Sequence, residues 1–223
     1  QGLIGFATLM AFTRILSPEA YGVYALTFGV SSLAQTAFFP WLEAPMARFY
    51  PAHARNDAEA PALYGTLYRL FVAVAVVFAL LCVAGLLLWR THTPEGQALK
   101  VGVAIGLACV APRSLVKLAQ EQRKSEGRVT PAAVIDMVQT AGAFGFGLAC
   151  AWAGIGGASP VLGAGLIALV IMPFVVREDW GRAVRGYFDK AEASHMAHYG
   201  FPVSASLILT LALYTADRFL IAH

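Results

Sequence analysis

Charged residues are scarce in this sequence. Asp, Glu, Lys and Arg together make up 13% of the 223 residues, whereas about 25% is usual for a soluble domain. Hydrophobic residues make up 58%, and they gather in runs of about 20, the length that an α-helix needs to cross a bilayer. The low charge argues against a soluble domain with one water-facing core, and the composition predicts a membrane protein.

Cysteine is also scarce, and Cys82, Cys109 and Cys150 each lie inside an apolar run. We interpret them as small packed side chains rather than as disulfide partners or metal ligands. His195-x-x-His198 has no evident carboxylate or cysteine partner. The stretch 182–199 is therefore predicted to be an amphipathic helix on the inner membrane surface rather than a metal site.

Catalytic and nucleotide-binding patterns are missing as well. No Ser/His/Asp set, no paired carboxylates at one site and no zinc-type spacing occur, so we expect neither an enzyme nor a cofactor. Gly154-Ile-Gly-Gly157 follows no predicted strand and precedes no lysine, which favours a turn over a phosphate loop. Nucleic acid is not an expected partner, because no Lys/Arg cluster is interleaved with aromatic residues.

What the sequence does contain is a series of apolar segments. Six are close to the roughly 17–25 residues that a spanning helix needs, and the first is shorter. The sequence therefore predicts an all-α fold, a polytopic transmembrane bundle of about seven helices. Gly102-x-x-x-Gly106 and a ladder of Gly145, Ala149 and Ala153 favour close helix packing. The segments run over Gln1–Leu16, Tyr21–Leu42, Tyr68–Trp89, Ala98–Ala119, Pro131–Trp152, Pro160–Val176 and Tyr199–Ala222.

The basic residues predict the orientation of this bundle. Twelve of the 16 Lys and Arg residues fall in the second, fourth and sixth connections. Because Lys and Arg concentrate on the cytoplasmic side, those connections and the N-terminus are expected to be cytoplasmic. Ser17-Pro18-Glu19 is then an outer hairpin turn, since proline cannot continue the first helix and Ser and Glu suit the start of the next. The outer side holds only Arg14, Arg90, Lys100 and Arg218.

Charged residues inside the predicted spans are candidates for function, because they are costly in a bilayer and usually face a bundle interior or a wet cavity. Alternatively, Arg48 and Arg113 extend to the inner interface, and Glu43 pairs with Arg48. Asp136 either complements a helix N-terminus or is a protonatable site in a cavity. Asp217 and Arg218 form either a local ion pair or the lining of a polar path. The full set is Arg14, Glu43, Arg48, Arg113, Asp136, Asp217 and Arg218.

Two short motifs resemble each other. Thr13-Arg14-Ile-Leu16 ends the first span, and Asp217-Arg218-Phe-Leu220 ends the seventh. An even number of spans separates them, so the two helices share a direction, as parallel repeats of a transporter do. The chain begins with Gln1 and ends directly after an apolar run, and we expect it to be a piece of a longer membrane protein.

Several motifs are similar to those of a known family. The run from Arg14 to Ala25, RILSPEAYGVYA, resembles the signature of polysaccharide (O-antigen type) flippases in the multidrug/oligosaccharidyl-lipid/polysaccharide exporter superfamily. The stretch Glu43–Pro51 looks like that family's second-loop motif, and Phe201-Pro202 together with Asp217–Leu220 is similar to its seventh span. The resemblance covers essentially the whole chain. It implies that residues 1–198 form the first lobe of a two-lobe transporter and that 199–223 are the first helix of the second lobe.

The resemblance also implies a substrate and a location. The substrate is an isoprenoid pyrophosphate carrying a short oligosaccharide, moved from the inner to the outer leaflet of the bacterial cytoplasmic membrane. The product serves O-antigen and lipopolysaccharide synthesis, which implies a polysaccharide polymerase and other assembly proteins as partners. Arginine binds phosphate oxygens with a planar fork, which suits a lumen for this substrate. The lumen or gate is predicted to use Arg14, Arg48, Arg113 and Arg218, with Glu43, Asp136 and Asp217 as counter-charges or coupling groups.

Other functions stay open. A cation-coupled multidrug antiporter of the same superfamily would depend on an intramembrane acid rather than on arginines. A membrane scaffold of a polysaccharide assembly complex would transport nothing and would not need the arginines of the spans. A membrane-bound transferase would need clustered His and Asp residues in a catalytic loop, which the sequence does not contain.

Overall fold

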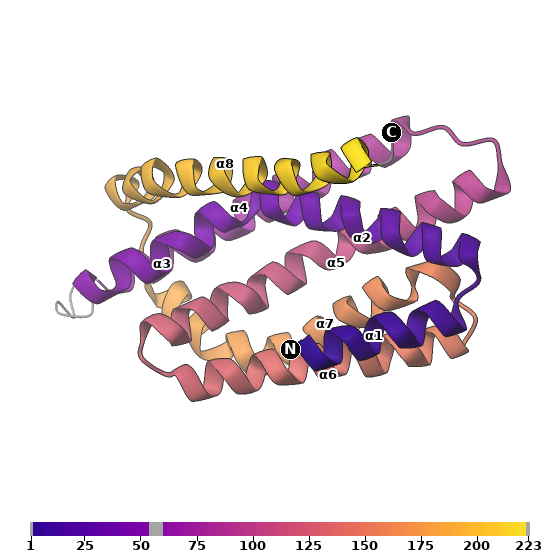
Figure 1. The fold of residues 1–223 in the computed structure, drawn as a ribbon. Coiled ribbons are helices and arrows are strands. Elements are labelled where there is room, and N and C mark those ends of the chain that lie inside the picture. The colour runs from indigo at the N-terminus through magenta and orange to yellow at the C-terminus, as the bar shows by residue number, and fades with distance from the viewer. Residues whose placement is uncertain (1, 54–59, 222–223) are drawn as a thin grey trace.

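The computed structural model describes residues 2–53 and 60–221, and within this part the chain is helical and contains no strand (Figure 1). The side chains of residues 2, 3, 47, 51–53, 60, 61, 212 and 214–221 lie outside the description. The helices alternate in direction along the bundle, except that α3 continues in the direction of α2 (Figure 1). They are α1 (Gly2–Ile15), α2 (Pro18–Phe38), α3 (Pro40–His53), α4 (Ala60–Leu88), α5 (Pro94–Ser125), α6 (Val129–Trp152), the short η1 (Gly156–Ala158), α7 (Ser159–Arg185) and α8 (Lys190–Ile221).

Two helices begin in the same way, with a capping hydroxyl followed by proline. The Ser17 hydroxyl accepts a hydrogen bond from the Ala20 N–H at 3.2 Å at the start of α2. The Thr93 hydroxyl accepts one from the Gly96 N–H at 3.2 Å at the start of α5. In each case the next residue is proline, whose missing N–H is not needed in the first helical turn. The turn predicted at residues 17–19 is therefore confirmed.

The second predicted segment, Tyr21–Leu42, contains a helix boundary that the hydropathy pattern does not reveal. Helix α2 ends at Phe38, and α3 begins at Pro40. Proline has no N–H to donate to the preceding turn and its ring crowds that turn, so the helix is interrupted there. Phe39 closes α2 by donating its N–H to the Gln35 carbonyl at 3.1 Å.

The amphipathic helix predicted over residues 182–199 is not formed. Arg182 and Arg185 belong to the last turn of α7, and Gly186, the residue that follows this helix, has an extended backbone. Helix α8 then begins at Lys190 and runs without a break through Tyr199, the residue at which the seventh span was predicted to start. The histidine pair therefore lies within the first part of α8 and not on a separate surface helix.

Within the described residues, four helices are long and apolar enough to cross a membrane: Ala62–Leu88, Pro94–Ser125, Val129–Trp152 and Gly156–Arg185. A shorter apolar stretch covers Ile4–Ile15. Helices α2 and α8 are not among these four, and α2 has polar side chains that face a neighbouring helix. The chain is an all-α membrane helix bundle, as predicted, and its described part contains four clearly apolar spans where about seven were expected.

Helix α5 lies in the middle of the bundle and packs against α2, α3, α6 and α7 (Figure 1). A Cβ on Gly102 would lie 2.7 Å from the hydroxyl oxygen of Thr27, and one on Gly106 would overlap that of Ser31. Glycine is therefore required where α2 approaches α5, which confirms the Gly102-x-x-x-Gly106 prediction. The ladder predicted from Gly145 is wrong, because nothing lies within 4 Å of a Cβ built there.

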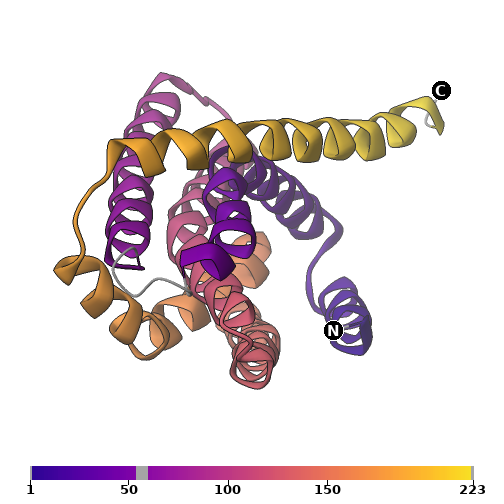
Figure 2. The same ribbon diagram turned by 90° about the vertical axis from the view of Figure 1, so that its left-hand side faces the viewer.

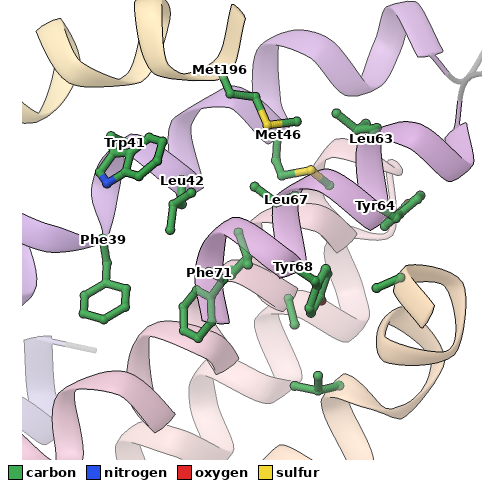
Figure 3. Close-up of a cluster of buried hydrophobic side chains, with 14 of the residues drawn as sticks. Phe39, Trp41, Leu42, Met46, Leu63, Tyr64, Leu67, Tyr68, Phe71 and Met196 are labelled. Atoms are coloured by element: carbon green, nitrogen blue, oxygen red, sulfur yellow. The ribbon is translucent and has the colours of Figure 1, made fainter. Parts of the chain in front are cut away.

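The apolar core sits where α3 and α4 meet α5, α7 and α8. Figure 3 shows Met196 of α8 reaching toward Met46 of α3, with Leu67 and Phe71 of α4 below them. Beyond this contact the C-terminal half of α8 projects away from the other helices (Figure 2). The core therefore fixes the start of α8 on the bundle.

Candidate functional site

A cavity of about 470 Å³ lies between the α1–α2 hairpin on one side and α5, α6 and α7 on the other. We call it the cationic cavity, because three basic side chains line it together with two acidic ones. One wall is aromatic: the Phe12 and Tyr24 rings lie 6.2 Å apart, and those of Tyr24 and Phe28 lie 6.0 Å apart. The polar lining residues are Thr8, Gln35, Arg113, Lys117, Gln120, Glu121, Lys124, Asp136, Gln139 and Thr140.

The basic residues of the cavity come from one face of α5. Arg113, Lys117, Gln120 and Lys124 follow each other at spacings of three or four residues, so they lie on one side of a helix. This face continues past Ala119, where the fourth predicted segment was expected to end, because α5 extends to Ser125. The cavity therefore gathers charges that the sequence pattern divided between a span and a loop.

Two of the three basic side chains of the cavity form ion pairs with carboxylates. Lys117 lies 2.7 Å from Oε2 of Glu43, whose side chain is 8% exposed, whereas that of Lys117 is 46% exposed. Lys124 lies 2.8 Å from Oε1 of Glu121 on the same helix. Oε1 of Glu43 is buried and has no hydrogen-bond partner among the described residues. Glu43 is thus a buried carboxylate neutralised on one oxygen by a lysine that also reaches the cavity.

Opposite these cations, α6 contributes amide, hydroxyl and carboxylate groups. Gln120 donates from Nε2 to Oε1 of Gln139 across the α5–α6 contact at 3.3 Å. Asp136 lies one turn before Thr140 on the same wall. Cations on one wall, with amides, a hydroxyl and a single carboxylate on the other, suit a ligand with an anionic part and hydroxyl-rich polar parts.

The structure brings together some of the predicted site residues. Arg113 and Asp136 line the same cavity, and Glu43 reaches it through Lys117. The predicted pairing of Glu43 with Arg48 is wrong. The guanidinium of Arg48 instead lies over the Tyr199 ring of α8, 4.6 Å from its centroid.

The other predicted residues do not join this cavity. Arg14 is exposed in the last turn of α1 and is not among the residues that line it. Asp217 and Arg218 lie within α8, but their side chains are outside the described part of the chain.

Helices α3 and α8 meet at and beside residues that carried part of the family resemblance. The rings of Trp41 and Phe201 stack with centroids 4.8 Å apart. Gly200 fits against the Trp41 backbone, where a Cβ would overlap the carbonyl oxygen. The stretch around Glu43 and the Phe201-Pro202 pair thus form one contact between α3 and the start of α8.

A second group of polar residues, which was not predicted from the sequence, lies mostly buried where α4, α5 and α7 meet. We call it the three-helix network. Arg123 lies 3.1 Å from Oδ2 of Asp179, and their side chains are 8% and 3% exposed. Gln122 donates to Oδ1 of Asp179 at 2.6 Å and accepts a hydrogen bond from the Tyr68 hydroxyl at 3.3 Å. The network consists of Tyr64, Tyr68, Gln122, Arg123, Glu126, Asp179 and Arg182.

Glu126 closes this network at the end of α5. It accepts hydrogen bonds from the Tyr64 hydroxyl at 3.0 Å, from Gln122 at 3.3 Å and from Arg182 at 2.8 Å. Burial by itself raises the pKa of Glu126, but the hydrogen bonds from Gln122, Tyr64 and Arg182, with the charge of Arg182, outweigh burial and lower it. The carboxylate therefore stays ionised and bonds to all three helices.

The sequence contained only a weak signal for this network. Gln122 and Glu126 are four residues apart, and their spacing extends the helical period beyond Ala119. If the predicted helix were extended to Glu126, Gln122 and Glu126 would lie on one face of it. The partner Asp179 on α7 has no signal in a single sequence, because nothing there shows which faces of two helices meet.

Comparison with known proteins gives one result. Residues 11–223 match the sequence model of a family described as polysaccharide biosynthesis protein. No curated protein and no solved structure is similar enough to this chain to count as a match.

Proposed function

Because the chain belongs to the polysaccharide biosynthesis protein family, we propose that it moves a lipid-linked oligosaccharide across the membrane for surface polysaccharide synthesis. The substrate is an isoprenoid pyrophosphate carrying a short sugar chain of the O-antigen type. The chain acts as a transporter and not as an enzyme. The observation that carries this proposal is the cationic cavity inside an apolar helix bundle.

The cavity suits a pyrophosphate for electrostatic reasons. Arg113 offers a planar fork that binds two phosphate oxygens at once, and Lys117 and Lys124 offer point charges on the same helix face. Attraction between opposite charges is stronger in a low-dielectric interior than in water. An arriving pyrophosphate would compete with Glu43 for Lys117, so the ion pair holds the lysine in place until the substrate binds.

The remaining parts of the substrate match other surfaces. The sugars would meet the amides of Gln35, Gln120 and Gln139 and the aromatic wall of the cavity. The isoprenoid chain has no polar groups and stays in the bilayer, against the exposed apolar side chains of the outer helices. A sugar that must cross roughly 30 Å of hydrocarbon needs such a polar path.

Transport would proceed by alternating access between two lobes, of which α1 to α7 form the first. Helix α8 begins the second lobe and is held to α3 by the Trp41–Phe201 stack and by Arg48 over Tyr199. The end of the bundle with the α5–α6 and α7–α8 turns faces the cytoplasm of a bacterial inner membrane, because most basic residues lie there. Rocking of the two lobes against each other would expose the cavity to one side of the membrane at a time.

A second candidate function is a cation-coupled multidrug antiporter, which Asp136 favours because this intramembrane carboxylate lines the same cavity. Such a protein would need Asp136 and would tolerate loss of Arg113. A scaffold of a polysaccharide assembly complex would tolerate loss of both. The two substitutions therefore separate the three functions.

The experiment tests the full-length gene in a flippase-deficient bacterial strain. We expect Arg113→Gln and Lys117→Gln each to reduce restored surface polysaccharide about tenfold or more, as loss of a charge-assisted hydrogen bond does. Arg90→Gln, which removes the same charge from the exposed α4–α5 connection, is the matched control. Full activity of both cavity variants at normal membrane abundance would exclude the proposal. Loss only in Asp136→Asn would favour the antiporter.

A further inference from the structure

A second hollow lies on the outside of the bundle, between α4 and α7, and the transport proposal does not use it. This α4–α7 groove has a volume of about 320 Å³, within the range of pockets that hold small ligands. It is lined by Tyr68, Arg69, Val72, Trp180, Ala183 and Val184. Arg69 is therefore the single charged residue in an otherwise apolar and aromatic lining.

Arg69 stands at the end of an exposed apolar stripe that runs along α4. Val72, Val76, Leu80 and Val83 follow it at spacings of three or four residues, so all lie on its side of the helix. Their exposed fractions are 42%, 53%, 65% and 55%. The groove thus opens onto a continuous apolar face, inside a helix that is long and apolar enough to span the membrane.

The Arg69 side chain is held at the end of the bundle. Its Nη2 donates to the Gly186 carbonyl, just after α7, at 3.0 Å. Gly65, one turn earlier on α4, packs against the same segment, where a Cβ would lie 2.7 Å from the Gly186 carbonyl carbon. The guanidinium has five N–H donors, of which this bond uses one. Among the described residues the guanidinium makes no other hydrogen bond, so its remaining donors can meet an oxygen-rich ligand at the mouth of the groove.

We propose that the α4–α7 groove binds one anionic phospholipid of the surrounding membrane. The phosphate pairs with Arg69, and one acyl chain lies in the groove and along the Val72–Leu80 stripe. Trp180, which is 43% exposed beside the groove, lies at the level where headgroup and hydrocarbon meet, as tryptophans at membrane interfaces do. Basic groups between transmembrane helices recognise anionic headgroups in this way.

The dimensions agree with one lipid leaflet. Eleven residues separate Arg69 from Leu80, which is about 16 Å along a helix. This is roughly half of the 30 Å hydrocarbon core. A protein partner would need a wider surface than this narrow groove, and it would have to displace lipid from the whole apolar face of α4. A lipid fits both the groove and the face that continues from it.

The test measures lipid binding to the purified full-length protein in detergent, by native mass spectrometry and by the thermal unfolding midpoint. The probes are phosphatidylglycerol and phosphatidylcholine with the same acyl chains. We expect the protein to bind phosphatidylglycerol about fivefold more tightly, the effect of one basic residue near an anionic headgroup. Arg69→Gln should abolish this preference. Arg185→Gln should keep it, because Arg185 is an exposed arginine at the same end whose one hydrogen bond within the described residues goes to the Gly181 carbonyl of its own helix.

A second variant guards against misfolding of the first, because Arg69 also anchors α4 to the chain after α7. Val72→Trp fills the groove and leaves the Arg69–Gly186 bond in place, and it should weaken binding of both lipids. If Arg69→Gln and Arg185→Gln reduced the preference for phosphatidylglycerol equally, the preference would arise from diffuse surface charge, and the proposal would be overturned. Absence of a preference in the wild type would also overturn it, as would full competition by inorganic phosphate. None of these outcomes depends on transport, so the site can fail or survive separately from the proposed function.

Discussion

The cationic cavity and the three-helix network contain the same kinds of residue and use them differently. In the network, Arg123 and Asp179 are almost fully buried, and Gln122 adds a further bond to the carboxylate. In the cavity, Lys117 is nearly half exposed, and the Glu43 carboxylate beside it keeps one buried oxygen without a partner among the described residues. The buried polar groups of the network all have hydrogen-bond or ion-pair partners, whereas those at the cavity do not all have one among the described residues. A saturated polar group holds helices together, whereas an unsaturated one leaves binding capacity for a ligand.

The largest expected effect concerns the network. Asp179→Ala leaves the buried Arg123 guanidinium without its carboxylate, and removing one partner of a buried ion pair destabilises a protein by about 3–5 kcal/mol. Chemical denaturation in detergent micelles measures this loss. The matched variant Glu121→Ala breaks the exposed pair with Lys124 and should cost at most about 1 kcal/mol. Equal losses in the two variants would remove the distinction between the regions.

A smaller effect is expected at the edge of the cavity, where the two partners of one ion pair differ in exposure. Lys117→Met leaves the buried Glu43 carboxylate unpaired and should lower the unfolding free energy by about 1–3 kcal/mol. Glu43→Gln leaves only a half-exposed ammonium, which water can solvate, and should cost less. The same denaturation measurement in both variants checks the order. A larger loss of unfolding free energy in Glu43→Gln than in Lys117→Met would contradict this order, because it would mean that the unpaired ammonium costs more than the unpaired carboxylate.

Arg113 should affect binding far more than stability. It lies at the cavity and outside the three-helix network, so Arg113→Gln should change the unfolding free energy by less than about 1 kcal/mol. The matched variant Arg123→Gln, on the same helix, should lower stability strongly. Unfolding curves of the two variants, compared at equal protein concentration, test this. Similar destabilisation in both would place Arg113 among the structural residues.

The smallest effect is a dependence of stability on pH through Glu126. Its pKa is lowered in the folded protein, because the hydrogen bonds it accepts outweigh burial. A carboxyl group whose pKa is lowered by folding stabilises the fold at any pH above its pKa in the unfolded chain, which is about 4.3 for Glu. That stabilisation is lost as the pH falls through the pKa of the folded protein. The wild type should therefore exceed Glu126→Gln in stability at neutral pH, with the difference shrinking below about pH 4. A difference that grows on acidification would contradict this assignment.

Most of the helices could be predicted from the sequence, and the places where prediction failed have physical reasons. Hydropathy finds apolar runs, and Ser17 and Thr93 before proline mark helix starts by local hydrogen bonds. Hydropathy does not register the break at Pro40, because proline and its neighbours are apolar. Hydropathy also places the end of α5 too early, at Ala119. Gln122 and Arg123 are polar and look like loop residues, because a single sequence does not show that Asp179 on α7 pairs with them in the protein interior.

The candidate site was predictable only in part. Intramembrane charge is rare enough to mark Arg113 and Asp136, and both line one cavity. The choice of partner was not predictable, because it depends on how helices pack. Arg48 and Glu43 are close in sequence, yet α8 brings Tyr199 to the arginine and α5 brings Lys117 to the carboxylate. Lys117 was not among the predicted site residues, and only the packed structure shows that it lines the cavity.

The central claim is that the cationic cavity binds the pyrophosphate of a lipid-linked sugar. The most direct measurement is the affinity of the full-length protein, in lipid nanodiscs, for an isoprenoid-pyrophosphate-linked oligosaccharide, compared between the wild type and Arg113→Gln. The account predicts that the variant binds about tenfold more weakly, while Arg90→Gln binds as the wild type does. Equal affinity in all three proteins would contradict it and would assign the cavity to another ligand.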